Sequence, residues 1–140
     1  MSTFSLTLSE RHRCVIAACS GSLDLAAVVA ERDRLSAAAA SGPCLFVLDL
    51  GGVTFLDSTA LGLFVVLHRR LAQHGGALVL ANVDRRVGRP IALMQLDSVI
   101  FVHWAEESRL SWTGDPALVV LAHTLGIDER VLTSAGPIAS

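Results

Sequence analysis

Apolar runs of strand length recur along the chain and are separated by segments with helical periodicity. Residues 4–8 alternate apolar and polar side chains, and residues 14–19 form an apolar run after a polar turn. This pair predicts a hairpin at the edge of a sheet. Further apolar runs at 44–50, 77–81 and 99–102 predict three more strands. The run at 44–50 has few polar positions on either face, which is typical of a central parallel strand covered by helices.

Two of the intervening segments have clear helix boundaries. The first helix is expected to follow Asp24, a good N-cap residue, and to end at Gly42-Pro43. The second is expected to begin at Asp57 or Ser58 and to end before Gly75-Gly76. The side chains at helical spacing are Leu25, Val28, Val29, Arg32 and Leu35 in the first helix and Leu61, Phe64, Val65, Val66 and Leu71 in the second.

A third helix is expected between the strands at 77–81 and 99–102. Asp84 is its expected cap, and Pro90 falls inside it and should shift its start or kink it. Its apolar residues are Val87, Ile91, Leu93 and Met94. Residues 104–110 could form a further short helix.

Together these elements predict one small α/β domain over residues 1–112. The sheet should be mainly parallel, with an edge hairpin strand and with helices packed largely on one face. Residues 113–140 form a C-terminal extension, with a short helix at 115–125 and a frayed tail. The 115–125 segment is too apolar to stay in water, so it should pack on this domain or on a second subunit. The second case would make the protein a homodimer, and the sequence does not decide between the two.

Composition narrows the class of protein. The 140 residues are 52% hydrophobic and 17% charged, which argues against disorder. No apolar segment approaches the roughly 18 residues that cross a bilayer, and the first residues lack a signal-peptide pattern. We therefore expect a cytoplasmic protein without membrane insertion. A net charge of −2 offers no footprint for nucleic acid.

Cysteine and histidine patterns argue against metal and redox sites. Cys14, Cys19 and Cys44 lie in or next to apolar strands and form no C-x-x-C pair, so they are expected to be structural, buried thiols. The five histidines show no metal-binding spacing. Nothing resembles a Walker loop, and no cofactor is expected.

The segment Asp57-Ser58-Thr59-Ala60-Leu61-Gly62 carries the candidate chemistry, because it puts two hydroxyls where a strand changes to a helix. A helix N-terminus offers free N–H groups and a positive dipole end, which suit a phosphate. The plain alternative is that Asp57-Ser58-Thr59 only caps the helix, and the tripeptide by itself favours that alternative.

Two motifs together resemble the STAS domain, and in particular the anti-sigma factor antagonists. They are Gly21-Ser22-Leu23-Asp24 after the second strand and Phe55 to Gly62 after the third, and the resemblance covers roughly residues 4–110. It implies that Ser58 is the phosphoacceptor, with Thr59 as the second candidate. The partner-binding residues that it implies are Ser22, Asp24, Asp57, Ser58, Thr59, Ala60 and Leu61.

Two positions depart from the family pattern. Ser22 stands where glutamate is usual, which removes one charge from the loop, and Ala60 stands where glycine is usual. The alanine methyl is expected to tighten the approach of a partner's backbone. Both departures weigh against an intact switch.

The resemblance also implies a partner-switching role in transcription regulation. The partner would be an anti-sigma factor with serine kinase activity, bound by the unphosphorylated protein and released after phosphorylation at Ser58, and a phosphatase would reset the switch. Two alternatives keep the fold: a non-switching scaffold of a stress-signalling complex, and an accessory subunit of a lipid transporter.

An enzyme is not expected. Ser58 as a nucleophile would need a base, but His68 lies ten residues further along the same helix, nearly three turns away. A G-x-S-x-G elbow is also lacking.

Overall fold

The computed structural model describes residues 4–11, 13–43, 45–106 and 110. The elements, in chain order, are β1 (Phe4–Arg11), β2 (Cys14–Leu23), α1 (Leu25–Ala40), β3 (Leu45–Leu56), α2 (Ser58–Ala72), β4 (Ala77–Val83), α3 (Arg89–Leu93), the 3-10 helix η1 (Leu96–Ser98) and β5 (Phe101–Trp104).

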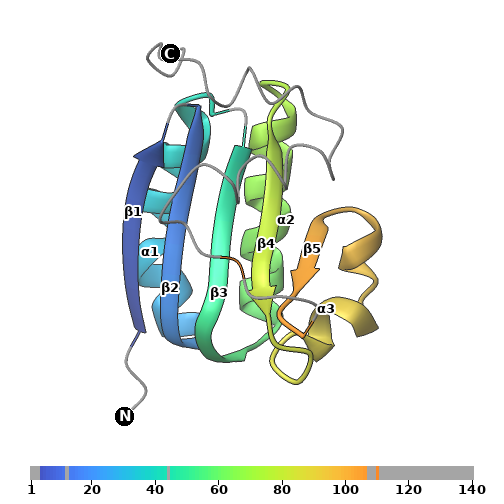
Figure 1. The fold of residues 1–140 in the computed structure, drawn as a ribbon. Helices are drawn as coiled ribbons and strands as arrows, with labels where there is room; N and C mark the ends of the chain where they lie inside the picture. Colours follow the sequence, from blue (N-terminus) through green and yellow to red (C-terminus); the bar gives the residue numbers. More distant parts are fainter. Residues whose placement is uncertain (1–3, 12, 44, 107–109, 111–140) are drawn as a thin grey trace.

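The sheet has the order β1-β2-β3-β4-β5. β1 runs antiparallel to β2, and every other neighbouring pair is parallel. α1 and α2 lie on the same face of the sheet, and α3 lies at the edge formed by β4 and β5 (Figure 1). The predicted α/β architecture, with its edge hairpin and one-sided helices, is confirmed.

Both faces of the central strands are apolar. On β3, Phe46 and Leu48 belong to the large core cluster beneath the helices, whereas Leu45 and Val47 belong to a smaller cluster on the opposite face. Successive side chains of a strand point to opposite faces, so burial on both sides requires an uninterrupted apolar run. This is why the sequence signal for β3 was strong.

The buried face of α1 differs from the predicted stripe. Leu25 and Val29 are 61% and 57% exposed, so the prediction that they share the buried stripe with Val28 and Leu35 is wrong. Ala27 and Ala39 are buried in their place, and the small alanine side chains allow the helix to lie close to the sheet. On α2 the same correction applies to Val66, which points away from the buried Phe64, Leu67 and Leu71.

The region after β4 departs most from the prediction. Asp84 does not cap the helix; its carboxylate accepts hydrogen bonds from the backbone N–H groups of Arg86 (2.8 Å) and Val87 (3.3 Å) in a turn. The helix proper starts at Arg89, because Pro90 has no N–H to donate and fits only the first helical turn. Its apolar residues also divide, since Ile91 is buried while Leu93 and Met94 are exposed.

The remaining boundaries shift along the chain. The strand predicted at 99–102 lies at Phe101–Trp104, because η1 and the hydrogen bond from Ile100 N–H to the Leu96 carbonyl (2.8 Å) precede it. Trp104 is therefore in a strand and not in a helix. β3 continues beyond the predicted end at 50 to Leu56. The expected helix at 115–125, the tail within 113–140, and Cys44 lie outside the described residues.

Candidate functional site

The two predicted motifs meet because β2 and β3 end side by side. β3 pairs with β4 only from Leu45 to Asp49, but it follows β2 much further, to the partners Leu23 and Leu56. The next residue along each strand is an aspartate, Asp24 or Asp57, and each caps a helix that starts there. The structure thus brings Gly21–Asp24 and the start of α2 together at the carboxyl ends of β2 and β3.

Asp57 is the N-cap of α2. Its backbone is extended (φ −124°, ψ −173°), and its Oδ1 accepts hydrogen bonds from the N–H groups of Thr59 (3.0 Å) and Ala60 (3.2 Å). Two of the four donors that a helix start leaves unsatisfied are therefore occupied by this carboxylate. Ser58 follows as the first helical residue.

The side chain of Ser58 is exposed, and within the described part of the chain its hydroxyl makes no hydrogen bond. Thr59, the second candidate, is half-buried. A hydroxyl that is exposed and unbonded at a helix N-terminus is accessible to a modifying enzyme. Its phosphate would lie near the positive end of the helix dipole.

Ala60 and Leu61 turn the other way. Ala60 is 0% exposed and belongs to the core cluster, and Leu61 is 7% exposed. The expectation that the Ala60 methyl tightens a partner's approach is therefore wrong, because the methyl faces the core and not the surface. The departure from glycine at this position therefore adds no exposed atom to the surface of α2.

The second aspartate, Asp24, caps α1 in a similar way. Its Oδ1 accepts a hydrogen bond from Ala27 N–H (3.1 Å), and the Ser22 hydroxyl donates to its Oδ2 over 3.5 Å. Both residues border a shallow hollow of about 220 Å³ that also includes Phe4 and Glu31. Ser22 is therefore part of the cap environment of α1, and the loop has one acidic charge at this point.

Ser58 stands at the rim of an apolar groove of about 290 Å³ between α2 and the segment from α3 to η1. The groove is lined by Ser58, Leu61, Gly62, Val65, Met94 and Leu96. A Cβ atom added at Gly62 would meet no atom within 4 Å, so the helix surface next to Ser58 is open. Sequence reasoning missed Met94 and Leu96 at this site, because only the tertiary fold brings them to α2.

The cysteines of the described residues lie in the core. Cys14 and Cys19 are both buried, which confirms their predicted burial. Burial raises the pKa of the Cys19 thiol from 9.0 to about 12, and the nearby charges of Asp49 and Glu31 act in the same direction. Among the described residues, no group of three or more His, Cys, Asp or Glu side chains could hold a metal ion.

Comparison with known proteins decides the family. A family model described as the STAS domain matches residues 5–109. The chain belongs to the STAS domain family. None of the curated proteins matches it. In the described ranges, none of the helices of this STAS protein has both the length and the apolarity to span a membrane.

Solved structures of the same fold include several anti-sigma factor antagonists. One from Mycobacterium paratuberculosis is 24% identical, with a TM-score of 0.66, and the match covers 84% of this chain and 93% of that chain. SpoIIAA in its unphosphorylated form is 21% identical, with a TM-score of 0.65 and coverage of 89% and 99%. An anti-sigma-factor antagonist domain protein from Planctomyces limnophilus is 18% identical, with a TM-score of 0.66 and coverage of 84% and 97%. At these identities the likeness establishes the fold.

Proposed function

We propose that this STAS domain protein is an anti-sigma factor antagonist that binds an anti-sigma factor with serine kinase activity, and that phosphorylation of Ser58 switches the binding off. The observation that carries the proposal is the exposed, unbonded hydroxyl of Ser58 at the start of α2. Binding and phosphorylation would take place in the cytoplasm, and a phosphatase would restore the binding form.

Electrostatics at this edge of the sheet supports a switch in binding and not in folding. A phosphate adds about −1.5 to −2 charges at neutral pH. Within the protein the helix N-terminus tolerates that charge, so the fold need not change. A partner packed over the same edge meets the new charge beside Asp57 and Asp24. Like charges at an interface cost several kcal/mol, and each 1.4 kcal/mol is about tenfold in affinity. A 100-fold decrease in the affinity for the partner follows without any allosteric step.

The structural relatives are compatible with such a switch. SpoIIAA has been solved in its unphosphorylated form and also in a phosphorylated form, which is 23% identical to this chain with a TM-score of 0.58. That protein therefore retains this fold in both states.

We assign the partner contact to the surface formed by Ser22, Asp24, Asp57, Ser58 and Thr59. The adjoining groove, to which Leu61 contributes, extends this surface with apolar contacts. Ala60 contributes no side chain to it, because its methyl is buried.

The test incubates wild type, Ser58→Ala and Thr59→Ala with the anti-sigma factor kinase of the same organism and ATP, and measures phosphate incorporation by intact-protein mass. We expect incorporation into wild type and Thr59→Ala but not into Ser58→Ala, because Thr59 is half-buried and β-branched. Undiminished incorporation into Ser58→Ala would overturn the assignment of the acceptor.

Binding is measured in parallel by calorimetry with the same kinase. Wild-type protein that binds the kinase but incorporates no phosphate would point to the non-switching scaffold. Wild-type protein that neither binds nor incorporates phosphate would overturn the antagonist role and favour an accessory subunit.

A further inference from the structure

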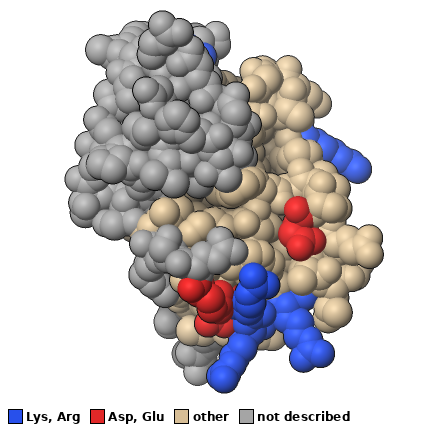
Figure 2. Space-filling model, turned by 45° about the vertical axis from the view of Figure 1, so that its right-hand side comes forward, with Lys and Arg blue, Asp and Glu red and all other residues tan. Residues whose placement is uncertain are grey.

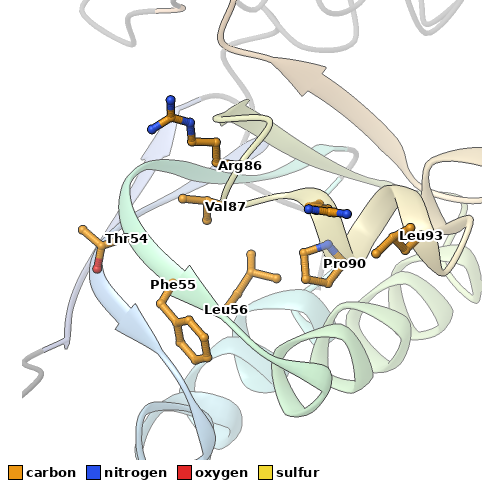
Figure 3. Close-up of a pocket in the computed structure, with 8 residues that line it drawn as sticks. Thr54, Phe55, Leu56, Arg86, Val87, Pro90 and Leu93 are labelled. Carbon is orange, nitrogen blue, oxygen red and sulfur yellow. The ribbon is translucent and has the colours of Figure 1, made fainter.

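A second groove lies between the end of β3 and the segment that follows β4 (Figure 3). Its volume is about 330 Å³, which is at the lower end for small-molecule sites. β3 contributes Thr54, Phe55 and Leu56, and the turn and α3 contribute Arg86, Val87, Arg89, Pro90 and Leu93. It shares no lining residue with the groove at Ser58.

Two arginines and no acid line the groove, and the acids at the adjoining turn, Asp84 and Glu106, accept hydrogen bonds from backbone N–H groups. None of its eight lining residues is acidic, and within the described ranges neither Arg86 nor Arg89 forms an ion pair. The acid closest along the chain is Asp84, whose carboxylate is already bonded to the backbone N–H groups of Arg86 and Val87. Basic side chains gather at the lower end of the face seen in Figure 2, with acidic side chains beside them.

The turn that presents these arginines is held in place. Gly88 N–H donates to the Asp84 carbonyl over 2.7 Å, and a Cβ at Gly88 would lie only 2.8 Å from the Trp104 ring. The third arginine of this turn, Arg85, stacks over Trp104, with its guanidinium carbon 4.6 Å from the ring centroid. Arg85 is thereby engaged within the protein, which leaves Arg86 and Arg89 for a ligand.

Apart from Thr54, the rest of the groove is apolar. Leu56 is buried, Val87 and Pro90 are half-buried, and Phe55 and Leu93 are 51% and 68% exposed at its border. Large apolar side chains that stay exposed next to two cations with no ion pair among the described residues are typical of a ligand site.

We propose that this groove binds a small amphipathic anion, a phosphate or carboxylate joined to an apolar body. The guanidinium groups of Arg86 and Arg89 bind the anion, since arginine matches the geometry of carboxylate and phosphate oxygens. Phe55, Pro90 and Leu93 cover the apolar body. This site does not depend on the role proposed for Ser58.

The test titrates the full chain with 2-naphthyl phosphate, 2-naphthoate and the neutral 2-naphthol, and follows backbone amide signals by NMR. We expect saturable shifts at residues 54–56 and 86–93 with both anions, and the stronger binder of the two identifies phosphate or carboxylate as the preferred group. Arg86→Gln/Arg89→Gln should weaken anion binding at least tenfold and leave 2-naphthol unchanged. The matched control Arg69→Gln/Arg70→Gln, at two exposed arginines near the end of α2, should change neither.

Leu93→Ala provides a second variant that keeps the fold, because this side chain is mostly exposed. This substitution should weaken the binding of all three probes. Equal anion affinity in wild type and Arg86→Gln/Arg89→Gln, shifts that lie elsewhere, or no saturation by either anion would each overturn the proposal.

Discussion

The starts of α1 and α2 are built alike but present different chemistry. Both helices leave the same edge of the sheet, and each is capped by an aspartate with an extended backbone. The residue after the cap is Leu25 in α1 and Ser58 in α2, and both side chains are exposed. α1 is capped without a hydroxyl at the position after Asp24. Capping therefore accounts for Asp57 but leaves Ser58 without a structural task.

The largest difference between the two helix starts should be seen in partner binding. Ser58→Asp is expected to weaken binding of the anti-sigma factor kinase by about 100-fold, because it adds charge where the interface closes, beside Asp57. Leu25→Asp places the same charge at the equivalent position of α1 and is expected to weaken binding by less than about tenfold. Calorimetric titration gives both values. Equal losses would mean that Ser58 is not special.

The two caps should differ in how much each contributes to the free energy of unfolding. Asp57→Ala and Asp24→Ala should each lower the free energy of unfolding by about 0.5–2 kcal/mol. The larger loss of helix-cap bonding is expected for Asp57, whose carboxylate accepts hydrogen bonds from two N–H groups of its helix, while that of Asp24 accepts one from its helix and one from the Ser22 hydroxyl. Urea denaturation compares the variants with wild type. The reverse order would contradict the hydrogen-bond pattern.

The alkylation rate of Cys19 measures how tightly α1 covers this part of the core. The thiol of Cys19 is buried and its pKa is raised to about 12, with Glu31 of α1 among the causes, so alkylation at pH 8 should be slow in wild type. Asp24→Ala should accelerate it several-fold more than Asp57→Ala, because loosening α1 opens this part of the core. Peptide mass spectrometry identifies the modified cysteine. Equal rates would show that the thiol is exposed through global unfolding.

The same thiol makes stability depend on pH. Its folded pKa of about 12 lies above the ordinary value of 9.0, so the folded state holds the proton more tightly than the unfolded state. The resulting stabilisation is complete below pH 9 and is lost as pH rises toward 12. Urea denaturation should show that the free energy of unfolding decreases less between pH 8 and pH 10 for Cys19→Ala than for wild type.

The smallest effect is expected for the stability of Ser58→Ala. Because the hydroxyl makes no hydrogen bond among the described residues and the cap is Asp57, the free energy of unfolding should change by less than about 0.5 kcal/mol. A thermal melt checks this directly. A loss as large as that of Asp57→Ala would restore the plain capping role.

The sequence could predict the site where the signal is local. An aspartate between an apolar strand and an amphipathic helix indicates a cap, and the residue after a cap is on the surface; Asp57 and Ser58 follow these rules. The sequence does not predict the burial of Ala60, because the resemblance treats the motif as a surface segment, whereas helical geometry turns the third residue of α2 toward the sheet. The face of α1 was missed because buried alanines give a weak hydrophobic signal.

Other features depend on tertiary contacts. Gly51, Gly52 and Thr54 interrupt the apolar pattern of β3, so its continuation to Leu56 depends on pairing with β2. Arg86 and Arg89 have no pattern in the sequence that marks a site, and only the fold places them across from the end of β3. No periodicity in the sequence connects these two segments.

The buried methyl of Ala60 acts as a spacer beneath the first turn of α2, which carries Ser58. Ala60 lies within the first turn of α2 and is packed in the core without remaining exposure. A larger side chain there would act as a wedge, lifting that turn from the sheet and costing about 1–3 kcal/mol in overpacking. Ser58 would then lie further from the sheet than it does now. The position of Asp24 would not change with it, because Asp24 follows a different strand, β2. The size of a residue that no partner can touch therefore determines how far the hydroxyl projects.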